Sequence, residues 1–198
     1  MGTQVDVDSG LVAGLRGDDP DAAVRLVERY GERVYRLAVR ITGTRDDAED
    51  AARSALMTAV DMIDAFKSDS SFGSWMDRLA ASAAYRKLMA RRGKTEEIAL
   101  DDVLPALDGG GRHFESMSDW SGRIDAWDAP GELRQILTDA VDALPPEYRV
   151  SLVLHDVEGM SNPDIAEALG IGLDAVRARV HRARLFLRKR LSDHLDSA

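Results

Sequence analysis

Apolar residues recur at helical spacing through the first half of the chain. They form three successive blocks between residues 21 and 92, a stretch with no proline and only three glycines. An apolar position at every third or fourth residue is the pattern of a helix with one buried face. The blocks are Leu26, Tyr30, Val34, Leu37 and Ile41, then Ala52, Leu56, Ala59, Ile63 and Phe66, then Phe72, Trp75, Met76, Leu79 and Ala83. The breaks between them are short and polar, which predicts an antiparallel helical bundle.

The ends of these helices carry their own signals. Thr44, followed by Asp47, and Ser71 are plausible helix starts, because a hydroxyl at the N-cap accepts a hydrogen bond from the first turn. A weaker helix is expected before the bundle, around residues 9–16. We expect residues 1–93 to form one small helical domain.

The pattern changes after this bundle. Residues 93–131 contain six glycines, two prolines and nine acidic residues, with no sustained period. This composition predicts a flexible acidic linker over residues 94–131. Trp120 and Trp127 are unusual in such a segment. They indicate either packing against a neighbouring domain or a motif that docks a partner.

Helical patterns return in residues 132–198. Helices are expected over residues 133–144 and, after Pro145 and Pro146, over residues 148–157. Ser161 and Asp164 have the spacing of a capping box for a short helix that ends at Gly170. A long last helix starts near Asp174, and one of its faces carries Val176, Val180, Ala183, Leu187 and Leu191. The whole chain therefore predicts an all-α fold of two small helical domains, an N-terminal bundle and a C-terminal helix-turn-helix domain, joined by the linker.

A short helix, a glycine turn and a basic helix together are typical of a DNA-binding helix-turn-helix. Residues 175–190 hold seven Lys or Arg and no acid, although the whole chain has a net charge of −9. The local field decides binding to a polyanion, so the acidic total leaves DNA binding open. The alternative is a solvated basic helix near a C-terminus, where the helix dipole favours cations.

Other classes of function are excluded or weakened by composition. The chain has no cysteine, and its four histidines are scattered. It shows no nucleophile–base pair, phosphate-binding loop or metal-ligand cluster, which argues against an enzyme and against a cofactor. No apolar run approaches the roughly 20 residues that span a bilayer, and the N-terminus lacks the features of a signal peptide. We therefore expect a cytoplasmic protein with no membrane insertion.

The C-terminal residues carry a family resemblance. The segments are Asp142-Ala-Leu-Pro-Pro-Glu-Tyr-Arg149, Leu152-Val-Leu-His-Asp-Val-Glu-Gly-Met-Ser161, Ile165-Ala-Glu-Ala-Leu-Gly170 and Val176-Arg-Ala-Arg-Val-His-Arg-Ala-Arg184. Together they resemble the fourth domain of bacterial extracytoplasmic-function (ECF) sigma factors of the sigma-70 family. The N-terminal bundle is similar to the second domain of that family. The segments there are Tyr30-Gly-Glu-Arg-Val-Tyr-Arg-Leu-Ala38, Asp46-Asp-Ala-Glu-Asp50, Ser70-Ser-Phe-Gly-Ser-Trp75 and Tyr85-Arg-Lys-Leu-Met-Ala-Arg-Arg92.

This resemblance implies a promoter-specificity factor without a catalytic site. Such a protein binds core RNA polymerase, recognises the −35 promoter element through its C-terminal domain and the −10 element through its N-terminal domain, and directs transcription initiation. An anti-sigma factor is a further implied partner. The residues implied for the −35 element are Arg177, Ala178, His181 and Arg182 as base readers, with Arg179, Arg184, Ser161 and Asn162 on the backbone.

The resemblance also implies residues for the other two contacts. For the −10 element these are Ser70, Ser71 and Phe72 in a loop, with Arg86, Lys87, Arg91 and Arg92 on backbone phosphates. For polymerase they are Asp46, Asp47, Glu49, Asp50, Arg53 and Ser54. The acids among them are open to a second interpretation, as a first helical turn stabilised by the helix dipole. Trp75 falls on the apolar stripe and is expected to be a buried core residue.

Several positions depart from the family pattern, among them Ala55, Leu56 and Met57, which lack the usual aromatic, and Ala175 and Ala178, which replace small hydroxyl residues. Arg53 and Ser54 stand where the family usually has Gln and an acid, and Ser82 and Arg86 stand where Asn and Asp are common near the −10 pocket. These departures keep a second hypothesis open, that of a sigma-derived DNA-binding regulator that does not productively engage polymerase.

Overall fold

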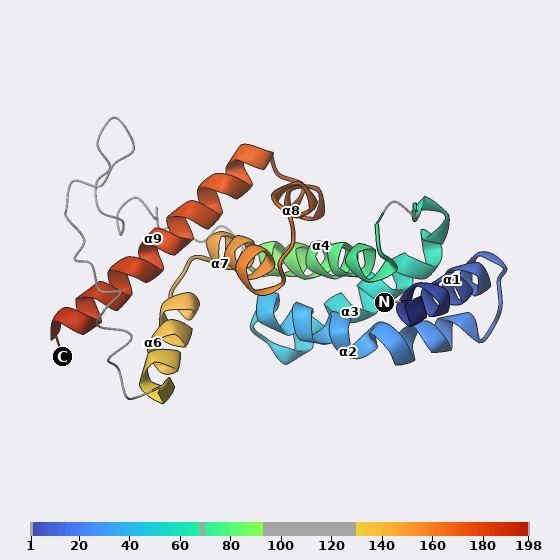
Figure 1. Ribbon diagram of the computed structural model, residues 1–198, viewed down its shortest axis with the longest axis horizontal. Helices are drawn as coiled ribbons and strands as arrows, with labels where there is room; N and C mark the ends of the chain where they lie inside the picture. Colours follow the sequence, from blue (N-terminus) through green and yellow to red (C-terminus); the bar gives the residue numbers. More distant parts are fainter. Residues whose placement is uncertain (1, 68–69, 93–129, 198) are drawn as a thin grey trace. The chain divides into compact units, whose positions relative to one another are not determined.

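The computed structural model describes residues 2–67, 70–92 and 130–197, and every regular element in these ranges is helical (Figure 1). The elements divide into two compact units. The first unit holds α1–α4, η1 and α8, and the second holds α6, α7, η3 and α9. The expected linker, with Trp120 and Trp127, lies outside the described residues. The predicted all-α class is confirmed.

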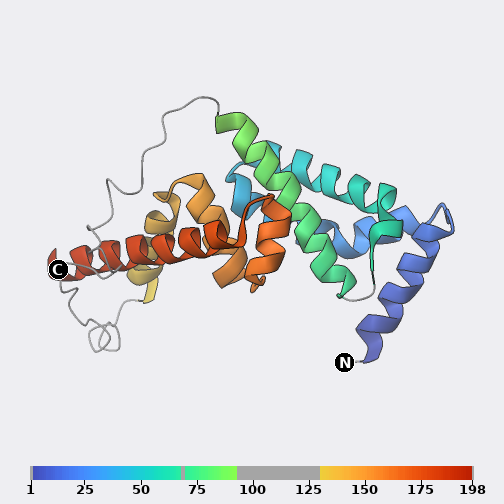
Figure 2. The ribbon, with the colours of Figure 1, turned by 90° about the horizontal axis from the view of Figure 1, so that it is seen from above.

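Three long helices form the core of the first unit. They are α2 (Ala22–Thr42), α3 (Arg45–Asp61) and α4 (Phe72–Arg92), and each packs against the other two (Figure 2). Leu26, Val34 and Ile41 of α2 and Met76 of α4 are fully buried. The buried residues of α3 are all alanines, and such small side chains allow neighbouring helices to approach closely.

The second predicted block does not form one continuous helix. α3 ends at Asp61, and Ile63 and Phe66 follow in and after the short 3₁₀ turn η1 (Ile63–Ala65). Both side chains are buried, whereas Leu56 within α3 is only half-buried. The apolar spacing continues through the turn because these residues cover the same core from a different backbone conformation.

Four aromatic rings close one end of the bundle. Tyr30, Phe66, Phe72 and Trp75 have neighbouring ring centroids 5.2–5.4 Å apart, and Phe72 meets Tyr30 and Phe66 edge to face. Aromatic pairs favour this geometry. Ser71 caps α4, because its hydroxyl accepts a hydrogen bond from the Ser74 amide at 3.1 Å. The predicted cap and the buried position of Trp75 are both confirmed.

The first helix is longer than the pattern predicts. α1 (Gly2–Arg16) begins seven residues before the expected start at Ser9. One carboxylate connects it to α2, since Asp8 accepts hydrogen bonds from the Tyr30 hydroxyl and the Arg29 guanidinium, each at 2.9 Å. Burial, with this bond to Asp8, raises the pKa of Tyr30 to about 12.

The short helix α8 (Asn162–Leu169) also belongs to the first unit. Ser161 caps it by accepting a hydrogen bond from the Asp164 amide, as the capping-box spacing predicts. Gly170 ends it with a φ of 66°, a left-handed conformation that glycine adopts without strain. Arg78 of α4 forms an ion pair with Asp164 at 2.9 Å.

The second unit is built around the long helix α9 (Leu173–Ser197). α6 (Pro130–Asp142) and α7 (Pro146–Leu152) pack against it. Leu144, Leu152, Ala183 and Phe186 form the centre of the core. The helix expected over residues 148–157 is in fact α7 followed by one π-helical turn, η3 (Val153–Val157), where the Glu158 amide bonds to the Val153 carbonyl.

Across the described ranges, no helix combines the length and the apolar character that a membrane-spanning segment requires.

Candidate nucleic-acid interface

The recognition-helix candidate α9 has one buried and one exposed side near its start. Val176, Val180 and Ala183 are buried at 0–4% exposure, as predicted. Arg177, Ala178 and His181 are exposed, and Arg179 and Arg182 are half-buried. Further along, Phe186 and Leu191 are buried and Leu187 only partly so, so the predicted stripe is shifted at that point. Three of the four predicted base readers, Arg177, Ala178 and His181, therefore lie on the accessible side of the first turns of α9, and Arg182 lies at its edge.

Arg184 differs from the other cations of α9. Its Nε donates to Oδ2 of Asp156 at 2.9 Å, and its Nη2 contacts Oδ1 of the same carboxylate at 2.5 Å. This hydrogen bond is the main reason why the pKa of Asp156 is lowered. Arg184 is expected on the DNA backbone, and in this structure its guanidinium lies against a carboxylate. The sequence pattern missed Asp156, because the two residues are separated by 28 positions.

The two polar residues at the start of α8 have different environments. Ser161 is exposed, and its hydroxyl also donates to a carboxylate oxygen of Asp164 at 2.5 Å. Asn162 is half-buried in the first turn. Both residues stand at a helix N-terminus, where backbone amides favour an anion.

The structure brings two predicted sites together between α3 and α4. Lys87, expected on −10 phosphates, forms an ion pair with Asp50 at 2.8 Å, and Arg91 forms one with Asp47 at 2.9 Å. Both acids were expected to face polymerase. The bond to Lys87 lowers the pKa of Asp50, and the Thr44 hydroxyl, followed by Arg91, lowers that of Asp47. These cations are thus partly neutralised within the bundle.

The remaining −10 candidates differ in exposure and in the contacts that they already make. Arg86 is exposed and has no ion pair within the described part of the chain, which distinguishes it from Lys87 and Arg91. Ser71 is occupied as a cap, and Ser70 is half-buried. Phe72 is 2% exposed, so its ring contributes to the core in this conformation. The side chain of Arg92 lies outside what the structure describes.

The outer face of α3 carries the remaining polymerase candidates. Asp46 is exposed, Glu49 pairs with Arg45 at 2.8 Å, and Arg53 approaches Asp50 at 3.6 Å. Ser54 is half-buried, and so is Ser82 on α4. The sequence analysis missed a set of exposed apolar residues on α2, α3 and the turn after α3. They are Val24, Val27, Met57, Val60 and Met62. The sequence feature that could have identified them is that these apolar residues lie outside the helical apolar stripes.

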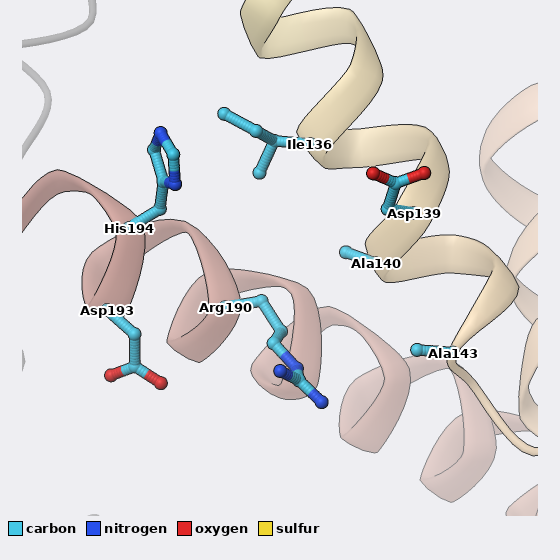
Figure 3. A pocket seen from close by; sticks show the side chains of 7 residues that line it. All are labelled: Ile136, Asp139, Ala140, Ala143, Arg190, Asp193 and His194. Atoms are coloured by element: carbon cyan, nitrogen blue, oxygen red, sulfur yellow. The ribbon is translucent and has the colours of Figure 1, made fainter. Parts of the chain in front are cut away.

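A pocket of about 430 Å³ lies between α6 and α9 (Figure 3). Its polar lining comprises Asp139, Asp193, Arg190 and His194, and Ile136, Ala140 and Ala143 complete it. This lining mixes acidic and basic side chains, so it does not indicate a ligand of one particular charge. Among the described residues, no group of three or more potential metal ligands is found.

Comparison with protein families gives two matches. Residues 26–94 match Sigma-70 region 2, and residues 134–187 match Sigma-70, region 4. The first range contains most of α2 and all of α3 and α4, and the second contains most of α6 and α9 with everything between them.

Several similar proteins are sigma factors. The chain is 30% identical over 179 residues to the ECF RNA polymerase sigma factor SigW of Bacillus subtilis, covering 90% of this chain and 94% of that protein. It is 32% identical over 172 residues to SigE of Mycolicibacterium smegmatis, of which it spans only 61%. The ECF sigma-E factor of Escherichia coli is 28% identical over 177 residues, with 89% and 90% coverage.

Two solved structures share the fold. CnrH in complex with the cytosolic domain of CnrY has a TM-score of 0.53 and 24% identity, covering 94% of this chain and 96% of that one. The sigma factor RpoE of Bartonella quintana, in complex with the anti-sigma factor NepR, also has a TM-score of 0.53, with 21% identity and coverages of 86% and 97%. These two likenesses concern the fold; the two regional matches and the SigW relationship show that the chain belongs to the ECF sigma factors of the sigma-70 family, the non-enzymatic initiation factors that direct RNA polymerase to promoters.

Proposed function

We propose that residues 132–198 form the domain that reads the −35 element, with Arg177, Ala178, His181 and Arg182 facing the bases. The observation that carries this proposal is the exposed, basic side of α9 opposite the buried Val176 and Val180. An α-helix fits the major groove, and its first turns are where base edges are usually read. Arg179, Ser161 and Asn162 are assigned to the DNA backbone, together with Arg188, which fixes register without reading sequence.

Residues 1–93 are assigned to the −10 element and to polymerase. Arg86 of α4 is the strongest −10 candidate, because it is exposed and without an ion pair among the described residues. Lys87, Arg91 and Arg92 are assigned to phosphates as well, and Ser70 and Ser71 to the loop before α4. We assign Phe72 to packing, since its ring is buried.

The polymerase contact is assigned to the outer face of α3. Asp46 and Glu49 give this face an acidic end that suits a basic partner, and Asp47 and Asp50, paired with Arg91 and Lys87, lie beside it on the side of α4. Arg53 and Ser54 lie next to them, and the exposed Met57 and Val60 add apolar area that a partner can bury. Residues 94–131 connect the two domains in this proposal.

A cytoplasmic location and an anti-sigma partner complete the proposal. RNA polymerase works in the cytoplasm, so a factor that binds it acts there. The likeness to RpoE of Bartonella quintana, solved with the anti-sigma factor NepR, supports an anti-sigma factor as a partner of this chain.

The −35 assignment is tested by two arginine substitutions on α9. Arg182→Ala should lose discrimination at one −35 position, at a cost of about 1–3 kcal/mol for that base pair. Arg188→Ala should weaken all sequences alike and reduce the dependence of affinity on salt by about one unit of slope. Binding of the full chain with core polymerase to a promoter library, at two salt concentrations, measures both effects. If the two variants behave identically, the assignment of Arg182 to the bases and of Arg188 to the DNA backbone is wrong.

A further inference from the structure

Asp156 lies beside a row of basic side chains on α9. Arg177, His181, Arg184 and Arg188 are spaced by four, three and four residues, which places them on one face of the helix. The carboxylate of Asp156, from the π-helical turn η3, meets this row at Arg184. An acid at this point opposes the attraction of the row for a phosphate backbone.

The contact is bidentate and accessible to solvent, since 54% of the Arg184 side chain is exposed. Two nitrogens of Arg184 reach the two oxygens of Asp156, at 2.9 and 2.5 Å. The side chain of Asp156 is 32% exposed. Nδ1 of His155 lies 2.6 Å from the same carboxylate and 3.2 Å from Nη2 of Arg184. A planar guanidinium that makes two hydrogen bonds to one carboxylate fixes the relative orientation of the two side chains as well as their distance.

A second acid on the same helix shows the contrast. Asp174 contacts Arg177 through one nitrogen at 3.3 Å, and its side chain is 97% exposed. Both residues belong to α9, three positions apart, so their contact ties no other element to the helix. Asp156, in comparison, connects η3 to the middle of α9 across 28 positions.

We propose that Asp156 and Arg184 are positioning residues, which fix the rotation of α9 so that Arg177, Ala178 and His181 face DNA. Arg184 acts through Asp156 and does not contact a phosphate. This inference rests on the proposed −35 function of α9. The inference also explains why an acid is tolerated beside a DNA-binding surface. The guanidinium of Arg184 neutralises the carboxylate of Asp156, and the same contact holds α9 in place.

The test compares variants of the full chain in complex with core polymerase. A −35 duplex is first selected from a random library by the wild-type complex, and affinities are then measured at several salt concentrations. Failure of the wild type to select any sequence would refute the proposed function itself, independently of the variants.

Asp156→Asn should weaken binding to the selected duplex by about fivefold to tenfold, although it removes a negative charge. Asp174→Asn, the matched control, should leave binding unchanged or strengthen it. Arg184→Lys should weaken binding as Asp156→Asn does, because lysine keeps the charge but lacks the planar guanidinium. Asp156→Glu, which retains the carboxylate, should recover part of the loss.

The opposite pattern overturns the inference. If Asp156→Asn strengthens binding and steepens its salt dependence, the released Arg184 contacts a phosphate. Full affinity in Arg184→Lys has the same meaning, since lysine also binds phosphate. Unchanged affinity in Asp156→Asn shows that the pair positions nothing. Should the Asn variant fail to fold, Arg184→Lys decides the question, with the cooperativity of its unfolding as the control for structure.

Discussion

Phe72 shows how burial separates two roles that one sequence motif combines. It belongs to the segment that the family resemblance places near the −10 element, yet its ring contacts Tyr30, Phe66 and Trp75 in the core. At 2% exposure the ring packs in the core, where it holds the start of α4 in place.

Truncation of this ring should therefore act on stability first. Phe72→Ala should cost about 3–5 kcal/mol of unfolding free energy, because it leaves a cavity in an aromatic cluster. Phe72→Leu, which retains most of the apolar volume, should cost much less. Urea unfolding of the full chain measures both. A Phe72→Ala variant that keeps wild-type stability but loses binding to −10 DNA would show that the ring contacts DNA instead.

Tyr30 gives a prediction in alkaline solution. Its pKa is raised from 10.0 to about 12, chiefly by burial, so the folded state retains a proton that the unfolded state releases. Its contribution to stability is complete below pH 10 and is lost as the pH rises toward 12. Tyr30→Phe should reduce the fall of unfolding free energy across this interval. An equal fall in both proteins would contradict the assignment.

Between α3 and α4, the ion pairs rank the predicted DNA contacts of the bundle. Arg86 is exposed and without an ion pair in the ranges that the structure describes, whereas Lys87 and Arg91 are matched with Asp50 and Asp47. A cation that must first leave a carboxylate contributes less to binding a phosphate.

Arg86→Ala should thus weaken promoter binding more than Lys87→Ala. The slope of the logarithm of the binding constant against the logarithm of the salt concentration should fall in magnitude by about one in Arg86→Ala and by less in Lys87→Ala. The measurement is the affinity of the polymerase complex for promoter DNA over a range of salt. Asp50→Asn is the control, and it should enlarge the effect of Lys87→Ala by releasing the lysine. A larger loss from Lys87→Ala in the wild-type background would contradict this ranking.

The same elements show what a sequence pattern can predict. The caps at Ser71 and Ser161 and the buried stripe of Val176, Val180 and Ala183 follow from local rules, and all are observed. The end of α3 does not follow, because apolar spacing continues through the turn η1. The π-helical turn η3 also escapes prediction, because the apolar spacing of this segment does not distinguish it from an α-helical turn.

At the site, too, local features could be predicted from the sequence and tertiary contacts could not. The exposure of Arg177, Ala178 and His181 follows from helical periodicity alone. The partners of Arg184, Lys87 and Arg91 do not, because each is an acid on another element, 28 to 44 positions away. Tertiary ion pairs of this kind cannot be predicted from a local sequence pattern, and they partly neutralise the cation that was predicted to bind a phosphate.

The whole chain combines an acidic total with concentrated basic surfaces. Its net charge is −9, while residues 175–190 hold seven cations and no acid. Such a distribution favours DNA binding that is local and salt-dependent. Membership of the ECF sigma factors accounts for the order of the two matched regions along the chain, with region 2 before region 4.

The most direct test of this account is a pull-down with bacterial core RNA polymerase followed by run-off transcription on a promoter library. We predict that the chain binds core polymerase and that transcripts start only from templates with a shared pair of −35 and −10 sequences. Binding to DNA without binding to core would contradict the account. Arg53 and Ser54 would then mark a lost polymerase contact, and the chain would be a sigma-derived regulator.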